Sequence, residues 1–295
     1  MEIKKVSVIG AGTIGHGIAR LFMFSGFEVN LMDSDSVVLE KALQAIKLNV
    51  ETYFVGRGKM SEADAKAMLN HLQDVSKLED AVAESDLVVE VISENLDLKK
   101  KVFSELDQLC PSHAILASNT SSLSITAIAS ATTRAESVIG MHFFNPPDVF
   151  RLLEVVPGLS TSEETVTTVI DLANRMKMVT LRVKDTPGFV INRFIGALFS
   201  EAALLVQNGI ASAETIDTGM RTAFGMRFGP CELMDYSGLE LMTSTLKLSP
   251  NYTDIYLIER MVEAGRYGIK NGKGFYDYLP DGTKKSADLS NIAGS

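Results

Sequence analysis

Apolar residues follow two different periods along this chain, and the two alternate. Short continuous apolar runs are typical of buried parallel strands, and runs with an apolar residue every three or four positions are typical of amphipathic helices. The predicted strands are Val6–Ile9, Glu28–Met32, Asp86–Ile92, Ala114–Ser118, Ser137–Phe143, Arg151–Val156 and Val179–Lys184. Strands that alternate with helices predict an α/β fold, a Rossmann-type doubly wound sheet.

Helical periodicity fills the intervals between these strands. The predicted helices are Ile14–Phe24, one from Ser34 or Asp35 to about Phe54, one from Ser61 to about Leu72, Asn95–Cys110, and one from Ser162 to about Met176. The second and third follow each other without a strand between them, so they predict a helical hairpin inserted after the second strand. Inserted elements at this point often face a ligand, and a solvated decoration fits the pattern equally well.

The alternation of strands and helices stops near residue 186. Thr186 followed by Pro187 is typical of a helix start. Beyond them the pattern predicts only helices, at Pro187–Val206, Ser212–Ala223, Glu232–Leu246 and Asp254–Ala264. We therefore expect two domains, a Rossmann domain over 1–186 and an all-α domain over 187–295. The first of these helices carries an apolar stripe too wide for a lone helix, so it needs cover from other helices or from a second subunit.

The first strand ends in a turn with the spacing G-x-G-x-x-G, at Gly10, Gly12 and Gly15. In such a unit the first glycine permits the tight turn, the second lets the backbone approach a pyrophosphate, and the third lets the helix pack on the strand. The helix start, with Thr13 and Ile14, presents free N–H groups and the positive end of its dipole to phosphates. We interpret this turn as a dinucleotide-binding site.

Asp33 ends the second strand, 18 residues after Gly15 (33 − 15), close to the roughly 20 residues expected for the ribose-binding acid. A carboxylate at this position accepts hydrogen bonds from both ribose hydroxyls and repels a 2′-phosphate. The pattern therefore predicts NAD rather than NADP as the cofactor. The alternative is a glycine-rich turn followed by an acid that happens to lie there.

Composition narrows the class of protein. The chain has 295 residues, 46% of them hydrophobic, and no apolar run approaches the ~18 residues of a membrane span. Its net charge of −9 argues against nucleic acid or an anionic membrane as a partner. Cys110 and Cys231 fit no metal or disulfide pattern, so we expect no metal and a reducing, cytoplasmic location. A strand begins within five residues of Met1, so we expect no signal peptide.

Polar residues gather where predicted strands end, which is where an open α/β sheet binds its ligands. Hydride transfer from an alcohol to NAD needs a base for the hydroxyl proton, and histidine, with a pKa near 6.5, suits this task. His142 closes one strand, and Glu154 lies within the next, otherwise apolar strand, where a carboxylate is costly unless it is paired. A strand-end histidine alone is more often structural than catalytic, but the nearby acid and the NAD pattern favour catalysis. The other three histidines (His16, His71 and His113) do not lie at the end of a predicted strand beside such an acid.

Five segments resemble the L-3-hydroxyacyl-CoA dehydrogenase family, and more narrowly its short bacterial members that act on 3-hydroxybutyryl-CoA. The segments are Ser118–Leu123 (SNTSSL), Gly140–Pro146 (GMHFFNP), Leu152–Val156 (LLEVV), Lys184–Arg193 (KDTPGFVINR) and Gly272–Tyr278 (GKGFYDY). They occur in the family's order, and the resemblance runs from about residue 3 to 279.

The resemblance implies a homodimer that interconverts a short (S)-3-hydroxyacyl-CoA and its 3-oxoacyl-CoA with NAD, in fatty acid or butanoate metabolism. It implies that His142 is the general acid/base, that Glu154 orients it, and that Ser121 and Asn192 contact the substrate. The further cofactor contacts that it implies are Glu94, Lys99, Ser121, Asn145 and Lys270. The helical hairpin would hold the CoA, with Arg57 or Lys59 near its phosphates, and the helical domain would serve substrate binding and dimerisation.

Plainer interpretations stay open for several of these residues. Ser121 could be a turn serine and Asn192 a solvated helix residue. Glu94 and Lys99 could be an exposed charge pair, which usually contributes little. Arg57 and Lys59 could simply be solvated.

The chain departs from the family pattern at three places. Gly225–Pro230 reads GMRFGP, which is similar to L-gulonate dehydrogenases, and Asp148 and Arg151 stand where apolar and lysine residues are common. Two rival functions therefore stay open, a dehydrogenase of a free hydroxy acid such as L-gulonate and an inactive NAD-binding scaffold.

Overall fold

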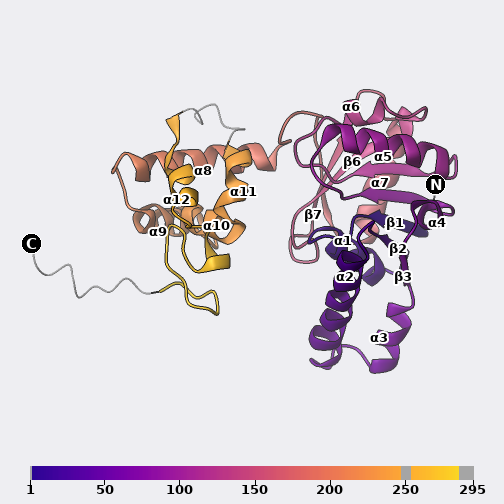
Figure 1. Cartoon of the computed structure of the whole chain (residues 1–295), viewed down its shortest axis with the longest axis horizontal. Coiled ribbons are helices and arrows are strands. Elements are labelled where there is room, and N and C mark those ends of the chain that lie inside the picture. Colours follow the sequence, from indigo (N-terminus) through magenta and orange to yellow (C-terminus); the bar gives the residue numbers. More distant parts are fainter. Residues whose placement is uncertain (1, 247–253, 286–295) are drawn as a thin grey trace, which may run out of the picture. The chain divides into compact units, whose positions relative to one another are not determined.

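The computed structural model describes residues 2–246 and 254–285. The chain divides into two compact units, Met1–Phe189 and Val190–Ser295, drawn from indigo to pink and from orange to yellow in Figure 1. Within the described ranges, no helix is both long and apolar enough to cross a bilayer.

The first unit is built on one sheet, to which its described residues contribute eight strands. They are β1 (Lys5–Ile9), β2 (Glu28–Met32), β3 (Leu72–Val75), β4 (Leu87–Glu90), β5 (Ile115–Ser118), β6 (Val138–Phe143), β7 (Leu152–Pro157) and β8 (Val179–Arg182). Their order is β3-β2-β1-β4-β5-β6-β7-β8, and the neighbours are parallel except β6 and β7. The order from β3 to β6 is that of a dinucleotide-binding Rossmann sheet, so the predicted fold class is confirmed.

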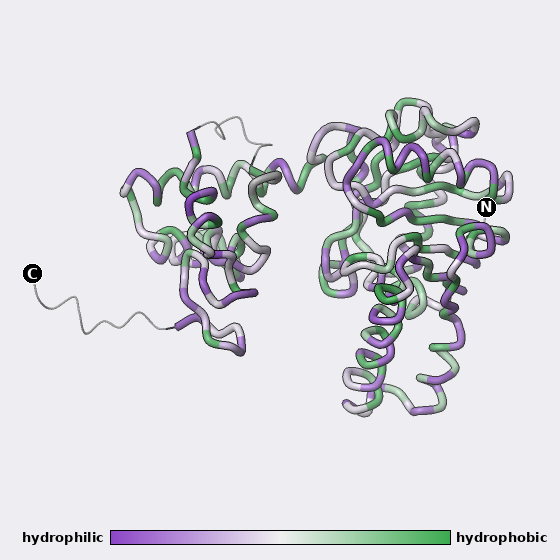
Figure 2. The backbone as a smooth tube through the Cα atoms, in the orientation of Figure 1, coloured by the Kyte–Doolittle hydropathy of each residue, from purple (hydrophilic) through white to green (hydrophobic). Residues whose placement is uncertain are grey.

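Helices cover both faces of this sheet. They are α1 (Gly15–Phe24), α2 (Ser36–Asn49), α3 (Glu62–Leu69), α4 (Leu78–Val82), α5 (Leu96–Leu109), α6 (Ile125–Ala129) and α7 (Glu163–Arg175), with a short 3₁₀ turn η2 (Ala135–Ser137). Successive strand residues point to opposite faces: Val89 shares a core with Phe22 of α1, and Val88 shares the other core with Phe103 of α5. Figure 2 shows the hydrophobic residues concentrated in the strands between these helices.

The helical hairpin after β2 is also confirmed. Helix α2 continues into a π-helical segment, η1 (Val50–Val55), and α3 returns toward the sheet; Figure 1 shows α2 and α3 extending away from it. Asp35 and Ser61 are the N-cap residues of α2 and α3. The Asp35 carboxylate accepts two backbone N–H groups of the first turn of α2, and the Ser61 hydroxyl accepts one in α3. Phe24 and Phe54, with ring centroids 4.7 Å apart, pack α1 against the hairpin.

The predicted length of the third helix was wrong. Helix α3 ends at Leu69, and Leu72–Val75 forms the edge strand β3 beside β2. Leu72 and Val75 are only half-buried and the two residues between them are exposed, so no continuous apolar run marks this strand. The five-residue helix α4 that follows was not predicted either, because one turn of helix is too short to show a period.

The predicted helix start at Pro187 was wrong as well. Helix α8 begins at Ile191, four residues later. Gly188 and Phe189 have φ values of 72° and 48°, which belong to the left-handed region and cannot continue a right-handed helix. The Phe189 amide donates to the carbonyl of Thr186 at 3.0 Å, so this segment closes a turn.

The second unit is helical. Its helices are α8 (Ile191–Gln207), α9 (Ala213–Phe224), α10 (Pro230–Ser237), α11 (Leu239–Leu246) and α12 (Leu257–Glu263), followed by a 3₁₀ turn η4 (Ile269–Asn271). The stretch predicted as one helix over 232–246 is two helices, since Gly238 interrupts it with a φ of 94°. The apolar stripe predicted on α8 comprises Phe194, Leu198, Phe199, Ala202, Leu205 and Val206. Phe199 and Ala202 lie in the core of this unit, whereas Phe194 is 76% exposed.

Two buried carboxylates tie the Gly272–Tyr278 segment to the helices of the second unit. Asp217 of α9 accepts the Tyr276 hydroxyl at 2.7 Å and also caps α10 through two backbone N–H groups. Asp235 of α10 accepts the Tyr278 hydroxyl at 2.9 Å and the amides of residues 275 and 276. These contacts hold the segment as a fixed loop against α9 and α10.

Candidate active site

The glycine turn after β1 has the geometry that its spacing predicts. Gly10 has a φ of 109°, and a methyl group on it would lie 2.6 Å from the carbonyl oxygen of Val91. A methyl group on Gly15 would lie 1.8 Å from the carbonyl oxygen of Gly10, so α1 packs against the turn too closely for any side chain. Gly12 instead faces open space. The start of α1 therefore offers an uncovered backbone surface to an anionic group.

Asp33 lies at the end of β2, next to this turn. Its Oδ2 accepts the amide of Ala11 at 2.8 Å and its Oδ1 accepts the amide of Asp35 at 2.9 Å. The carboxylate lines a pocket of about 510 Å³ together with Gly10 and Gly12. A ribose next to a pyrophosphate fits these groups, so the residues present fit NAD.

The far wall of this pocket was not predicted from the sequence. Leu98, Val102 and Glu105 line it from one face of α5. Their spacing of four and three residues places them on the same helix face, and Leu98 is 41% exposed. A partly exposed leucine on a helix that follows a Rossmann strand is the signal that could have found this wall, because an adenine ring needs an apolar surface.

Replacing Asp33 by serine is expected to weaken NADH binding about 10–100-fold, since one or two hydrogen bonds to a charged group are lost. NADPH binding should improve at the same time, because the repulsion of the 2′-phosphate disappears. Fluorescence titration with both cofactors measures the change. Asp35→Ser is the matched control, since serine still caps α2 and this acid does not line the pocket; an unchanged cofactor preference in Asp33→Ser would contradict the assignment.

His142 and Glu154 lie directly opposite each other on β6 and β7, the antiparallel pair of the sheet. The imidazole Nδ1 and the carboxylate Oε2 are 2.7 Å apart, and the two residues are 6% and 0% exposed. The rings of Phe144 and Phe189 flank the imidazole, with centroids 4.6 and 5.6 Å away. The histidine is thus held in one orientation by a charge on one side and aromatic rings around it.

This pairing determines what the imidazole can do. An ionised carboxylate only accepts hydrogen bonds, so Nδ1 of His142 must donate to Glu154. In the neutral ring the lone pair then lies on Nε2, which can take a proton from a hydroxyl group. The carboxylate also stabilises the imidazolium that results. The geometry is that of a general acid/base with an orienting acid.

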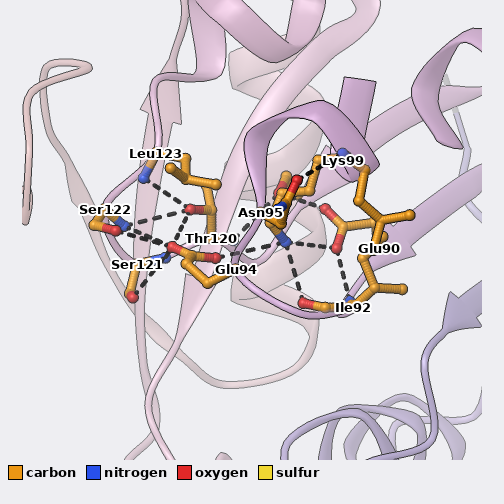
Figure 3. A network of polar contacts seen from close by, with 11 residues as sticks. Glu90, Ile92, Glu94, Asn95, Lys99, Thr120, Ser121, Ser122 and Leu123 are labelled. Atoms are coloured by element: carbon orange, nitrogen blue, oxygen red, sulfur yellow. Dashed lines mark hydrogen bonds and ion pairs between the residues drawn. The ribbon is translucent and has the colours of Figure 1, made fainter. Parts of the chain in front are cut away.

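The loop after β5 is organised by Glu94 (Figure 3). Glu94 Oε1 accepts the hydroxyl of Thr120 at 2.5 Å and the amides of Ser121 and Ser122, both at 3.1 Å. The side chain of Ser121 is only partly buried. Glu94 therefore fixes the backbone of the loop that carries Ser121, a role that the sequence did not show.

A buried ion pair lies behind this loop (Figure 3). The Lys99 ammonium is 2.6 Å from Glu90 Oε1 and 3.6 Å from Glu94 Oε2, and it is 1% exposed. Glu90 also accepts the Ser118 hydroxyl at 2.7 Å. The interpretation of Lys99 as part of an exposed pair is therefore wrong. Glu90 was missed, although an acid that closes a fully apolar strand is a signal of a paired charge.

Stability at low pH should depend on Glu94. Burial raises the pKa of this carboxyl, but the Thr120 hydroxyl, the Lys99 charge and the Ser122 side chain together hold the pKa below its usual value. Its contribution is therefore present above the unfolded pKa of about 4.3 and is lost as pH falls through the lower folded value. We expect Glu94→Gln to be less stable than the wild type at pH 7, with the gap narrowing below about pH 4. Urea unfolding across this range measures the gap, and a gap that does not change with pH would contradict the expectation.

The remaining predicted site residues belong to other segments of the two units. Asn145 is exposed in the loop after β6, and Arg57 and Lys59 are exposed at the end of the hairpin, with the Arg57 guanidinium 4.6 Å from the Tyr53 ring centroid. Two more belong to the second unit: Asn192 lies in α8, and Lys270 lies in η4, where its ammonium pairs with Glu240.

The described part of the chain contains no group of three His, Cys, Asp or Glu side chains that could hold a metal. Cys110 and Cys231 are both free and buried. Burial raises the pKa of the Cys110 thiol to about 12, and it raises that of Cys231 further. Neither thiol is a reactive nucleophile near neutral pH.

A histidine paired with a buried acid at the carboxyl end of a dinucleotide-binding sheet has the geometry for proton exchange beside a cofactor that exchanges a hydride. The chain is accordingly an NAD-dependent dehydrogenase. The family model described as 3-hydroxyacyl-CoA dehydrogenase, NAD binding domain, matches residues 5–186, and the model for the C-terminal domain of the same family matches 188–278. The chain belongs to the 3-hydroxyacyl-CoA dehydrogenase family.

Named relatives cover almost the whole chain. A probable 3-hydroxybutyryl-CoA dehydrogenase of Bacillus subtilis is 40% identical over 94% of this chain and 98% of its own length. A 3-hydroxybutyryl-CoA dehydrogenase of Clostridioides difficile is 39% identical over 93% and 99%. The crystal structure of (S)-3-hydroxybutyryl-CoA dehydrogenase PaaH1 from Ralstonia eutropha superposes with a TM-score of 0.88 at 36% identity, covering 94% of this chain and all of that one. The resemblance to this family is confirmed.

Proposed function

We propose that this enzyme interconverts (S)-3-hydroxybutyryl-CoA and acetoacetyl-CoA with NAD, in fatty acid or butanoate metabolism. The substrate follows from the relatives that carry this name and match over nearly their full length. The chemistry rests on one observation, the 2.7 Å contact of the His142 imidazole with the buried carboxylate of Glu154. The comparisons do not favour a free hydroxy acid as substrate or an inactive scaffold.

His142 is the general acid/base of the proposed reaction. In the oxidative direction its Nε2 takes the proton of the 3-hydroxyl group, and Glu154 holds Nδ1–H and stabilises the imidazolium. Bound NAD supplies the acceptor for the hydride that leaves C3. In the reductive direction the imidazolium returns its proton to the 3-oxygen. Phe144 and Phe189 keep water from the ring and so preserve its orientation.

Other side chains bind rather than react in this proposal. Ser121, on the loop that Glu94 fixes, donates a hydrogen bond to the 3-oxygen or the thioester of the substrate, and Asn192 holds the reacting carbonyl. Asn145 and Lys270 contact the cofactor. Lys99 is buried beside two carboxylates, so its part in cofactor binding is to keep Glu94 and its loop in place.

The domain assignments also belong to this proposal. Residues 1–186 bind NAD, and residues 187–295 serve substrate binding and dimerisation, supported by the exposed apolar side chains of Phe194, Phe224 and Leu241 at 76%, 75% and 67%. Arg57 and Lys59 face the phosphates of CoA. The two free, buried thiols suit a reducing cytoplasm. Light scattering at micromolar concentration tests the dimer.

Initial rates with acetoacetyl-CoA test the function directly. NADH should support rapid reduction and NADPH should support much slower reduction, because Asp33 excludes the 2′-phosphate. Free acetoacetate and L-gulonate, the latter with NAD, serve as the comparison substrates. Turnover confined to the CoA ester supports the proposal, and faster turnover of a free acid would overturn it.

A further inference from the structure

The loop between β6 and β7, residues 144–151, is seated on the helix that begins at the glycine turn. Gly17 of α1 lies directly under Pro147 of this loop, since a methyl group on Gly17 would meet the proline ring at 3.0 and 3.2 Å. Phe22 of α1 packs edge-on against Phe143, at the end of β6, with centroids 6.3 Å apart. One side of the β6–β7 loop therefore packs against α1.

An ion pair fixes this loop to α1. Arg20 Nη2 donates to Asp148 Oδ1 at 2.8 Å, and the two side chains are 10% and 24% exposed. The Arg20 Nε is also buried and makes no hydrogen bond within the part of the chain that the structure describes. Asp148 is thus the charged partner of a largely desolvated guanidinium. Moving the loop away from α1 would leave that charge unpaired, which is unfavourable, so the ion pair holds the loop in place.

We propose that Arg20 and Asp148 are positioning residues, whose ion pair holds the β6–β7 loop on the dinucleotide-binding helix so that cofactor binding at the glycine turn fixes Phe144 and Asn145. Asp148 is one of the positions at which this chain departs from its family's pattern, and in the structure this aspartate forms an ion pair with Arg20. The kinetic part of this inference rests on the proposed function.

The physical basis is that α1 is a single rigid element of about 15 Å. Its first residue, Gly15, belongs to the phosphate-binding turn, and Gly17 and Arg20 hold the loop from the same helix. Strand register places His142 opposite Glu154, and Phe189, which lies outside the loop, still flanks the imidazole when the loop is released. Release of the loop should therefore disturb Phe144 and Asn145 while the acid/base pair stays in place.

The expected kinetic signature is a rise in KM for NADH. Asp148→Ala should raise it about tenfold, with a change of less than about twofold in KM for acetoacetyl-CoA. Asp148→Ala should also lower the melting temperature, because the Arg20 guanidinium loses its partner. Arg182→Gln is the matched control, since Arg182 pairs with Glu163 at an exposed site of the same unit. It should leave both KM values and the melting temperature unchanged.

A double variant separates positioning from simple stabilisation. Arg20→Met combined with Asp148→Ala removes the buried charge as well, so the melting temperature should recover. The loop is still not held, so KM for NADH should stay about tenfold high. Recovery of KM together with stability would overturn the proposal, as would a wild-type KM in the single variant.

Hydrogen–deuterium exchange provides a readout without turnover. The amides of Val149 and Phe150 donate to the carbonyl of Pro146 within this loop, so their exchange reports its order. NADH should slow exchange of the amides of Phe144, Asn145 and residues 148–150 in the wild type and leave it unchanged in the double variant. Slowed exchange in an enzyme that does not reduce acetoacetyl-CoA would reject the proposed function and retain this inference. No effect of NADH on the wild-type loop would reject the inference alone.

Discussion

Replacing His142 by glutamine is expected to lower kcat for acetoacetyl-CoA reduction about 10²–10⁴-fold, the usual loss when a general acid/base is removed. Glutamine is close to histidine in size and can still approach Glu154, so the strand pair should remain intact. Because His142 does not line the pocket that carries Gly12 and Asp33, the Kd for NADH should stay within about twofold. Steady-state kinetics and fluorescence titration measure the two quantities.

A second histidine provides the control for this experiment. His113 lies on the surface, where its Nε2 is 3.1 Å from Asp86 Oδ1 and its side chain is 52% exposed. His113→Gln should therefore leave kcat unchanged. Near-normal turnover of His142→Gln would remove the basis of the proposed mechanism. Equal losses of turnover and of NADH binding would show instead that the substitution had damaged the fold.

Replacing Lys99 by methionine should lower the free energy of unfolding by about 3–5 kcal/mol, the usual cost when one partner of a buried ion pair is lost. The Glu90 carboxylate is 0% exposed, and without the ammonium at 2.6 Å its partners among the described residues are the Ser118 hydroxyl and the Ile92 amide. Urea denaturation followed by circular dichroism measures the loss. The same variant should impair turnover, since Lys99 also lies near Glu94, the acid that fixes the serine loop.

Neutralising both members of the pair tests whether charge is the cause. Glu90→Gln added to Lys99→Met removes the buried charge and keeps one oxygen to accept the Ile92 amide, while the new NH2 group can donate to the Ser118 hydroxyl oxygen. Most of the lost stability should therefore return. Arg182→Gln, at an exposed ion pair, should leave the unfolding curve unchanged. If Lys99→Met proves as stable as the wild type, the pair does not support the fold.

Much of the first unit could be predicted because its strands are buried on both faces. Such strands read as uninterrupted apolar runs, and the predicted Asp86–Ile92 differs from β4 only at its ends. Edge strand β3 lacks this signal because water covers most of it. The turn at Thr186–Phe189 has the composition of a helix start. Phe189 nevertheless has a left-handed φ and a ring buried in the core, and no local pattern encodes either feature.

The same limit applies to the site. His142 and Glu154 could be related in the sequence because they lie on consecutive strands and one of them is an acid among apolar residues. The partners of Glu94 lie 26 to 28 residues further along the chain, and Asp148 lies 128 residues from Arg20. Such pairs form only when the sheet brings distant segments together, so local periodicity carries no trace of them.

In the antiparallel hairpin of β6 and β7, the pairing of His142 with Glu154 and the sequence of the connecting loop can change independently in evolution. The acid/base pair is set by which residues face each other across the ladder, so an insertion at the tip of the hairpin need not shift it. Homologues could lengthen, shorten or recharge that tip, and an engineer could diversify the exposed positions Val149 and Phe150 as a library while leaving the proton-transfer pair and the Arg20–Asp148 contact in place.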